Sequence, residues 1–122
     1  MSNKINYLSK NKIDDYINNN LNIAKINKIY GGQTSRTLEE RKNEHISKDS
    51  RFKNINIYEI TNCKTKNLNQ SKYIEDYLIS KLNEKFAEKC INDRNNNGSI
   101  AHRGGAGQNN LNIYHTFYVM YK

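Results

Sequence analysis

Arg41 and His45 stand four residues apart in the stretch LEERKNEH. At that spacing two side chains project from the same face of a helix, so both can act on one group. A guanidinium presents a planar fork of N–H donors that fits a phosphate, and an imidazole can exchange a proton near neutral pH. With Tyr30 upstream, the set favours phosphodiester chemistry. Simpler explanations stay open: Arg41 can pair with Glu44, His45 can cover the core, and Tyr30 can pack in a sheet.

Glu75 lies on the apolar side of a long predicted helix. At about 100° per residue it projects within roughly 40° of the centre of the apolar stripe. That stripe consists of Leu78, Ile79, Leu82 and Phe86. A carboxylate facing a core needs a cation, a metal ion or hydrogen-bond donors. Alternatively, Glu75 stands in the first turn, where the helix dipole favours acids. Position alone leaves both explanations open.

Apolar periodicity and capping residues divide the chain into short elements that would position these side chains. We expect helices at residues 11–25, 37–47 and 71–89, strands at 26–30, 54–60 and 112–122, and a loop at 92–110. Thr37 and Glu40 form a capping box, and Gly31 and Gly32 are expected to stop the strand before it. A chain of 122 residues is expected to be one domain, residues 1–122. The predicted class is α/β or α+β, with helices flanking a small antiparallel or mixed sheet.

The segment Tyr30-Gly31-Gly32-Gln33-Thr34, with Arg41 and His45 after it, resembles the second half of the signature of the GIY-YIG nucleases. Gly31 stands where the family usually has isoleucine, and no GIY motif precedes Tyr30. The C-terminal TFYVMYK resembles that missing strand, with Tyr118 in the tyrosine position. The resemblance therefore implies a circularly permuted sheet, in which the last strand of the chain lies beside residues 26–30. The segment YIEDYLISKLN resembles the family's glutamate helix and places the metal-binding role on Glu75.

The resemblance implies a role for each residue of this set. Glu75 would hold one Mg²⁺ or Mn²⁺ ion, and Arg41 would bind the scissile phosphate. Tyr30, helped by Tyr118 or His45, would take a proton from the attacking water, with its pKa lowered by Arg41 and the metal. The residues expected to bind nucleic acid are Gln33, Lys42, Lys72, Asn92 and Arg103. Asn92, with Asn95 as the competing match, is also expected to help order the site.

Composition gives the expected partner and location. Lys and Arg number 20 against 12 Asp and Glu, a net charge of +8, which favours a polyanion such as DNA, with RNA also open. Asn, Lys, Ile and Tyr are encoded by AT-rich codons, which weakens this argument. Cys63 and Cys90 form no zinc motif, and no membrane segment or signal peptide is visible, so we expect an intracellular protein. The oligomeric state is left open.

These features predict a divalent-metal-dependent endonuclease that hydrolyses DNA phosphodiester bonds at a single-metal site. The alternative is a noncatalytic, basic nucleic-acid-binding protein that keeps the same scaffold. Gly31 and the missing upstream GIY motif favour the alternative.

Overall fold

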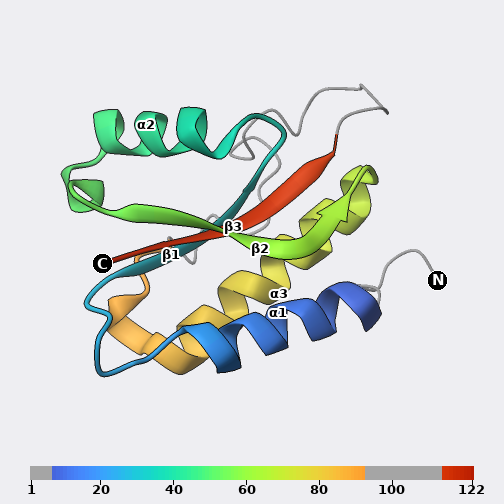
Figure 1. Cartoon of the computed structure of the whole chain (residues 1–122), viewed down its shortest axis with the longest axis horizontal. Coiled ribbons are helices and arrows are strands. Elements are labelled where there is room, and N and C mark those ends of the chain that lie inside the picture. Colours follow the sequence, from blue (N-terminus) through green and yellow to red (C-terminus); the bar gives the residue numbers. More distant parts are fainter. Residues whose placement is uncertain (1–6, 93–113) are drawn as a thin grey trace.

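A computed structural model describes residues 7–92 and 114–122 of the chain. Its elements, in chain order, are α1 (Tyr7–Asn20), β1 (Ile29–Thr34), α2 (Leu38–Lys48), β2 (Asn56–Thr65), α3 (Leu68–Phe86) and β3 (His115–Tyr121). Two single 3₁₀ turns follow α2 and α3, at Ser50–Phe52 and Ala87–Lys89. The predicted small α+β fold with a helix-flanked antiparallel sheet is confirmed (Figure 1). Arg103 and most of the expected 92–110 loop lie outside the described residues.

The last strand of the chain is the middle strand of the sheet. The strand order is β1-β3-β2, and β3 pairs antiparallel with both neighbours. Opposite β1, Tyr118 is the register partner of Gly32, and Met120 that of Tyr30. Beyond the strand, the Lys122 carbonyl accepts a hydrogen bond from the Asn27 amide at 2.7 Å. The prediction that the C-terminal strand lies beside the strand carrying Tyr30 is therefore confirmed.

Helices cover both faces of this sheet, α1 and α3 on one face and α2 on the other (Figure 1). Successive residues of a strand point to opposite faces, so β3 supplies two separate apolar clusters. Phe117 and Val119 join the larger cluster with α1 and α3. Tyr118 and Met120 join the smaller cluster, which also includes Phe52 and Ile55. The Tyr118 phenol therefore lies on the α2 side of the sheet.

The capping box predicted for α2 is confirmed. The Thr37 side chain accepts a hydrogen bond from the Glu40 amide at 3.1 Å, and the Glu40 carboxylate accepts one from the Thr37 amide at 3.1 Å. The start predicted for α3 is wrong, because Asn67 caps the helix through the Gln70 amide and Ser71 lies within it. Glu75 consequently lies past the first turn of α3, so the dipole explanation for a first-turn acid does not apply to it.

Other predicted boundaries are wrong as well: α1 starts at Tyr7 and not at residue 11, and β2 ends at Thr65 and not at residue 60. Helix α1 ends at Asn20, and the Leu21 side chain that was expected to continue it is buried outside the helix. Strand β1 starts at Ile29 and runs through Gly31 and Gly32 to Thr34. Glycine weakens a strand in isolation, but here β3 pairs with every residue of β1. No helix in residues 7–92 and 114–122 is both long and apolar enough to cross a membrane.

Candidate active site

The hydroxyl of Tyr118 joins the side chains that the sequence singled out on α2. Arg41 donates a hydrogen bond from Nε to the Tyr118 Oη at 3.2 Å, and the His45 Nε2 lies 3.1 Å from the same oxygen. Tyr118 itself is 0% exposed. Because Arg41 and His45 stand one turn apart on one helix face, a single buried phenol can reach both, as their spacing predicted.

Gly32 provides the space that the Tyr118 ring occupies. A Cβ at position 32 would lie 2.5 Å from the Tyr118 Oη and 2.8 Å from its Cζ. Such contacts are shorter than any side chain tolerates, so the phenol covers the place where another residue would carry a side chain. Gly32 in β1 is thus needed for the position of Tyr118 in β3.

Tyr30 packs beside the same cluster through its ring. Its centroid lies 4.8 Å from that of His45, in an edge-to-face arrangement, and 5.2 Å from that of Phe52. Phe52 also lies 4.6 Å from the His45 ring. Edge-to-face aromatic contacts of this kind fix ring orientation in addition to burying surface. The simpler explanation for Tyr30, that it packs within the sheet, therefore holds, and its ring packs next to His45.

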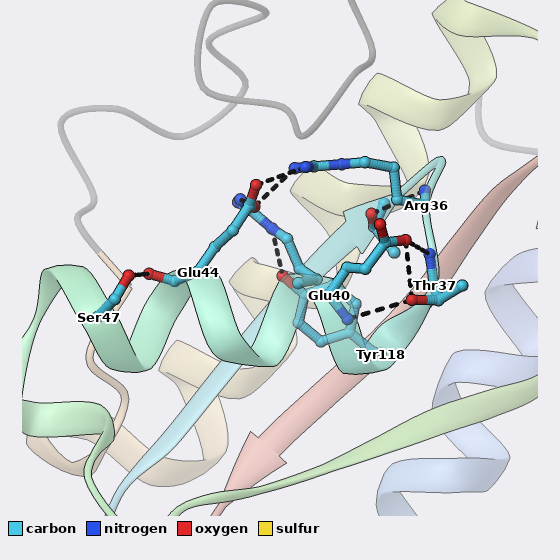
Figure 2. Close-up of polar contacts among 8 residues, drawn as sticks. Arg36, Thr37, Glu40, Glu44, Ser47 and Tyr118 are labelled. Atoms are coloured by element: carbon cyan, nitrogen blue, oxygen red, sulfur yellow. Dashed lines mark hydrogen bonds and ion pairs between the residues drawn. The ribbon is translucent and has the colours of Figure 1, made fainter.

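Glu44 connects Arg41 to a second arginine. The Arg41 Nη1 donates to the Glu44 Oε1 at 3.0 Å, and the Arg36 Nη2 donates to the same oxygen at 2.6 Å. Figure 2 shows the Arg36 side chain extending along α2 to reach Glu44. The ion pair with Glu44 that was the simpler explanation for Arg41 is present, and it coexists with the bond to Tyr118.

Glu75, on α3, acts on the same two phenols through its charge. Burial is the largest cause of the raised pKa of Tyr30; the Arg41 charge opposes the increase, and the Glu75 charge adds to it. The raised pKa of Tyr118 likewise reflects burial first, with Glu75 among the further causes. Glu75 is half-buried between the fully buried Ile74 and Leu78. Glu75 and Arg41 therefore influence one pair of tyrosines from two different helices.

Arg41 alone does not lower the pKa of Tyr30. Burial outweighs the attraction of Arg41 and raises this pKa, whereas the predicted lowering required a metal ion in addition to Arg41. Burial, reinforced by the Arg41 charge, lowers the pKa of His45 to about 4, so this imidazole is neutral at pH 7. Burial alone would lower the pKa of Arg41, but Tyr118 and Glu44 raise it overall, and Arg41 remains a cation.

The residues expected to bind nucleic acid differ in how far they are exposed. Gln33 is 1% exposed, and its Oε1 lies 3.0 Å from the His115 Nδ1, so its side chain contacts the last strand. The sequence could not show that its neighbour would be a histidine from the last strand. Lys42 and Lys72 are partly exposed on α2 and α3. Arg103 lies outside the described residues.

Asn92 orders the backbone of the site. Its Nδ2 donates to the Gly31 carbonyl at 2.9 Å, and its Oδ1 accepts from the Gly31 amide at 3.0 Å. Next to it, the Ile91 amide donates to the Ile29 carbonyl at 2.8 Å, so this segment pairs with the outer edge of β1. Both polar atoms of the Asn92 side chain bond the backbone of β1, which fits the ordering role expected of Asn92.

Three residues of the site were missed from the sequence. Arg36 stands just before the α2 cap, and only the structure shows that its side chain runs back along the helix to Glu44. Phe52 follows α2 in an irregular turn with no periodicity to reveal it. Gly32 was interpreted as a strand terminator, whereas its role is to make room for Tyr118.

Comparisons with known proteins give no further information on this site. No protein-family model matches the chain, and neither curated proteins nor solved structures include a significant match to it.

Proposed function

We propose that the protein is a divalent-metal-dependent endonuclease that hydrolyses DNA phosphodiester bonds. The observation that supports it best is the convergence of Arg41 and His45 on the Tyr118 hydroxyl, at 3.2 Å and 3.1 Å. These residues come from an early helix and from the last strand of the chain, and Glu75 acts on the same phenol from a third element. A permanent cation, a neutral imidazole and a carboxylate around two phenols are suited to hydrolysis of a phosphodiester.

Glu75 fits the role of metal ligand. Its negative charge acts on two phenols at once, that of the buried Tyr118 and that of the partly buried Tyr30, and a cation beside it would offset that charge. Mg²⁺ and Mn²⁺ prefer oxygen ligands, and Mg²⁺ commonly binds through one or two carboxylates together with water and substrate phosphates. Residues 7–92 and 114–122 contain no group of three or more His, Cys, Asp or Glu side chains that could hold a metal. When bound at Glu75, the ion would supply charge neutralisation on the phosphate.

The other residues of the site would each have a separate role in hydrolysis. Arg41 stays protonated and would bind and neutralise the scissile phosphate. His45 is neutral at pH 7 and its Nε2 can accept the proton of the Tyr118 hydroxyl, so Tyr118 would pass its own proton to His45 as it takes one from the attacking water. Tyr30, whose pKa is raised, would act as a hydrogen-bond donor. Tyr118 would also orient Arg41 and His45 relative to each other.

A plasmid assay tests the proposal. Supercoiled DNA incubated with the protein and Mg²⁺ or Mn²⁺ should be nicked, and EDTA should abolish the nicking. Glu75→Gln and Arg41→Lys should each lower the rate by about 100-fold or more, as expected when a group that stabilises transition-state charge is lost. Glu39→Gln and Arg51→Ala change charge on exposed positions near α2 and should retain the native rate. Nicking that survives in both Glu75→Gln and Arg41→Lys would contradict the site.

A noncatalytic nucleic-acid-binding protein is the second candidate, and one observation favours it. Both phenols have raised pKa values, and Arg41 already bonds Glu44 and Tyr118, so the described residues are arranged as a stable polar network. This candidate predicts that a labelled duplex is retarded on a gel at low salt. It also predicts that no divalent metal produces cleavage.

A further inference from the structure

Glu44 occupies a position in which an anion is bound by two arginines. The Arg36 Nη1 lies 2.5 Å from the Glu44 Oε2, and the Arg36 Nη2 lies 2.6 Å from its Oε1. The Arg41 Nη1 donates to that same Oε1 at 3.0 Å. Three N–H donors from two guanidinium groups therefore converge on one carboxylate, in the bidentate geometry that carboxylates and phosphates share.

The exposure of these three side chains leaves an approach from solvent. The Arg36 side chain is 41% exposed and that of Glu44 is 29% exposed, whereas that of Arg41 is 13% exposed. The cluster thus has an open side at Arg36 and a closed side at Arg41, which Tyr118 holds through Nε. With two guanidinium groups against one carboxylate, the cluster keeps a net positive charge.

We propose that Arg36 and Arg41 form a phosphate clamp in which Glu44 is a built-in competitor, displaced when a backbone phosphate of the substrate binds. The inference rests on the proposed nucleic-acid substrate, but it requires no cleavage. It adds Arg36 as a phosphate-binding residue and Glu44 as a residue that tunes affinity.

Physical considerations favour displacement over a permanent ion pair. A phosphate group carries its charge on several oxygens and can accept from both arginines, so it can replace the carboxylate without leaving a donor unpaired. Hydrogen bonds from Arg36, followed by those from Arg41, lower the pKa of Glu44 to about 2. The Glu44 carboxylate is therefore charged near neutral pH, and its charge competes with a phosphate to the same extent throughout that range. The ion pair between Arg36 and Glu44 is exposed, and exposed ion pairs contribute little stability, so releasing Glu44 from Arg36 costs little.

The position of Arg36 explains why Glu44 is needed in the absence of substrate. The Arg36 amide donates to the Thr34 hydroxyl at 3.0 Å, which fixes its backbone just before the α2 cap Thr37. Its side chain is long and half in solvent, and without a partner it would lose orientation. Glu44 holds the guanidinium next to that of Arg41, where both can reach one phosphate.

A binding experiment in EDTA tests the clamp without any requirement for catalysis. Glu44→Gln keeps the shape of the side chain and removes its charge, so it should tighten binding of a short DNA duplex about fivefold. Glu39→Gln removes the same charge from the exposed start of α2 and should change affinity less than about twofold. Binding by Glu44→Gln that is no tighter than binding by Glu39→Gln would overturn the competitor role.

Arg36→Ala supplies the complementary variant. It should weaken duplex binding and reduce the slope of log affinity against log salt by about 1, as expected for one lost phosphate contact. The matched control is Arg51→Ala, because Arg51 is also an exposed arginine held by a carboxylate, Asp49, at 2.6 Å. Equal salt slopes for Arg36→Ala and Arg51→Ala would overturn the role of Arg36.

Inorganic phosphate separates this inference from the proposed function. Titrated into the protein, it should shift the Nε–Hε resonances of Arg36 and Arg41 in NMR spectra and leave that of Arg51 unchanged. Those shifts would support the clamp even if plasmid DNA were never cut, in which case the endonuclease proposal alone would fail. Unchanged Arg36 and Arg41 resonances at saturating phosphate would refute the clamp, whatever the cleavage result.

Discussion

The Tyr118 hydroxyl holds Arg41 and His45 together, so its removal should affect both stability and activity. Tyr118→Phe keeps the buried ring but leaves the Arg41 Nε and the His45 Nε2 without this partner. Loss of a buried hydrogen-bond partner costs about 1–3 kcal/mol, and we expect the free energy of unfolding in urea to fall by that amount. We also expect plasmid nicking to fall by about 10-fold or more, because both side chains lose their orientation.

Tyr114→Phe is the control for this substitution. Tyr114 is 55% exposed, and its ring lies 4.8 Å from the Lys66 ammonium, a contact that phenylalanine preserves. Its unfolding free energy should remain within about 0.5 kcal/mol of the native value. If Tyr118→Phe were as stable and as active as Tyr114→Phe, the Tyr118 hydroxyl would have no organising role.

The lowered pKa of His45 makes stability depend on pH in a defined window. The unfolded chain binds a proton on His45 below about pH 6.5, whereas the folded protein does not until about pH 4. More protons are then bound by the unfolded chain, so stability falls as the pH decreases from 6.5 to 4. The loss should amount to about 1–3 kcal/mol. Urea denaturation between pH 5 and 7 measures most of the window. It also lies above the range in which Glu44 and Asp49 affect stability, which runs from their unfolded pKa values of about 4.5 and 3.8 down to about 2.

His45→Gln should flatten this pH dependence, since glutamine has no proton to gain. The same decline with pH in native and substituted protein would show that another group causes it.

At the scale of single residues, the sequence predicted how side chains on the same helix are placed relative to each other. Helical periodicity placed Arg41 and His45 on one face, because the geometry of a helix is independent of its surroundings. The partner of both, Tyr118, was named from a resemblance, and no periodicity could have shown that its ring would lie over Gly32. The raised pKa of Tyr30 was also unpredictable, because it depends on burial.

At the scale of elements, close packing of α3 against β1 depends on Gly31. A Cβ at position 31 would lie 2.7 Å from the Leu82 Cδ1 and 3.0 Å from the Leu78 Cγ. Gly31→Ala should therefore lower the free energy of unfolding by about 1–3 kcal/mol, since the core is already filled. Gly31→Ile, which introduces the larger residue found at the resembling position of GIY-YIG nucleases, should destabilise the protein further. Thermal and urea unfolding of both variants measure the effect.

Leu82→Val provides a test of the cause. If the clash with Leu82 is responsible, the smaller side chain should reduce the cost of Gly31→Ala, so that the double variant is more stable than the two separate losses would give. Strict additivity would contradict close packing at this point as the reason for glycine.

Local sequence patterns predicted some boundaries of the helices and strands and missed others. The α2 cap was predicted because Thr37 and Glu40 are local partners. The continuation of β1 through Gly31 and Gly32 was missed, because the strand is held by β3 on one side and by Asn92 on the other. Those partners lie far away in the sequence, and local propensity contains no information about them.

At the scale of the whole molecule, the order of elements in the chain differs from their order in space. β1 and β2 are not neighbours, and both pair with β3, the last element of the chain. Because long-range pairings close late, the sheet is completed only when the C-terminal strand is available. The site has the same requirement, since Tyr118 lies in that strand.

A chain that ends at Tyr114 should therefore fail to fold. It lacks β3, whose residues Phe117, Tyr118, Val119 and Met120 are all 0% exposed, and it leaves two strands without a shared partner. We expect the truncated chain to show no cooperative urea transition by circular dichroism and no plasmid nicking. Lys122→Ala keeps the whole strand and the backbone bonds to Asn27 and Lys28, and removes only the amine bonded to the Lys53 carbonyl at 2.7 Å. That variant should unfold within about 1 kcal/mol of the native protein. A sharp unfolding transition in the truncated chain would mean that β1 and β2 can be held in place without β3, and the dependence of the site on the last strand would then be lost.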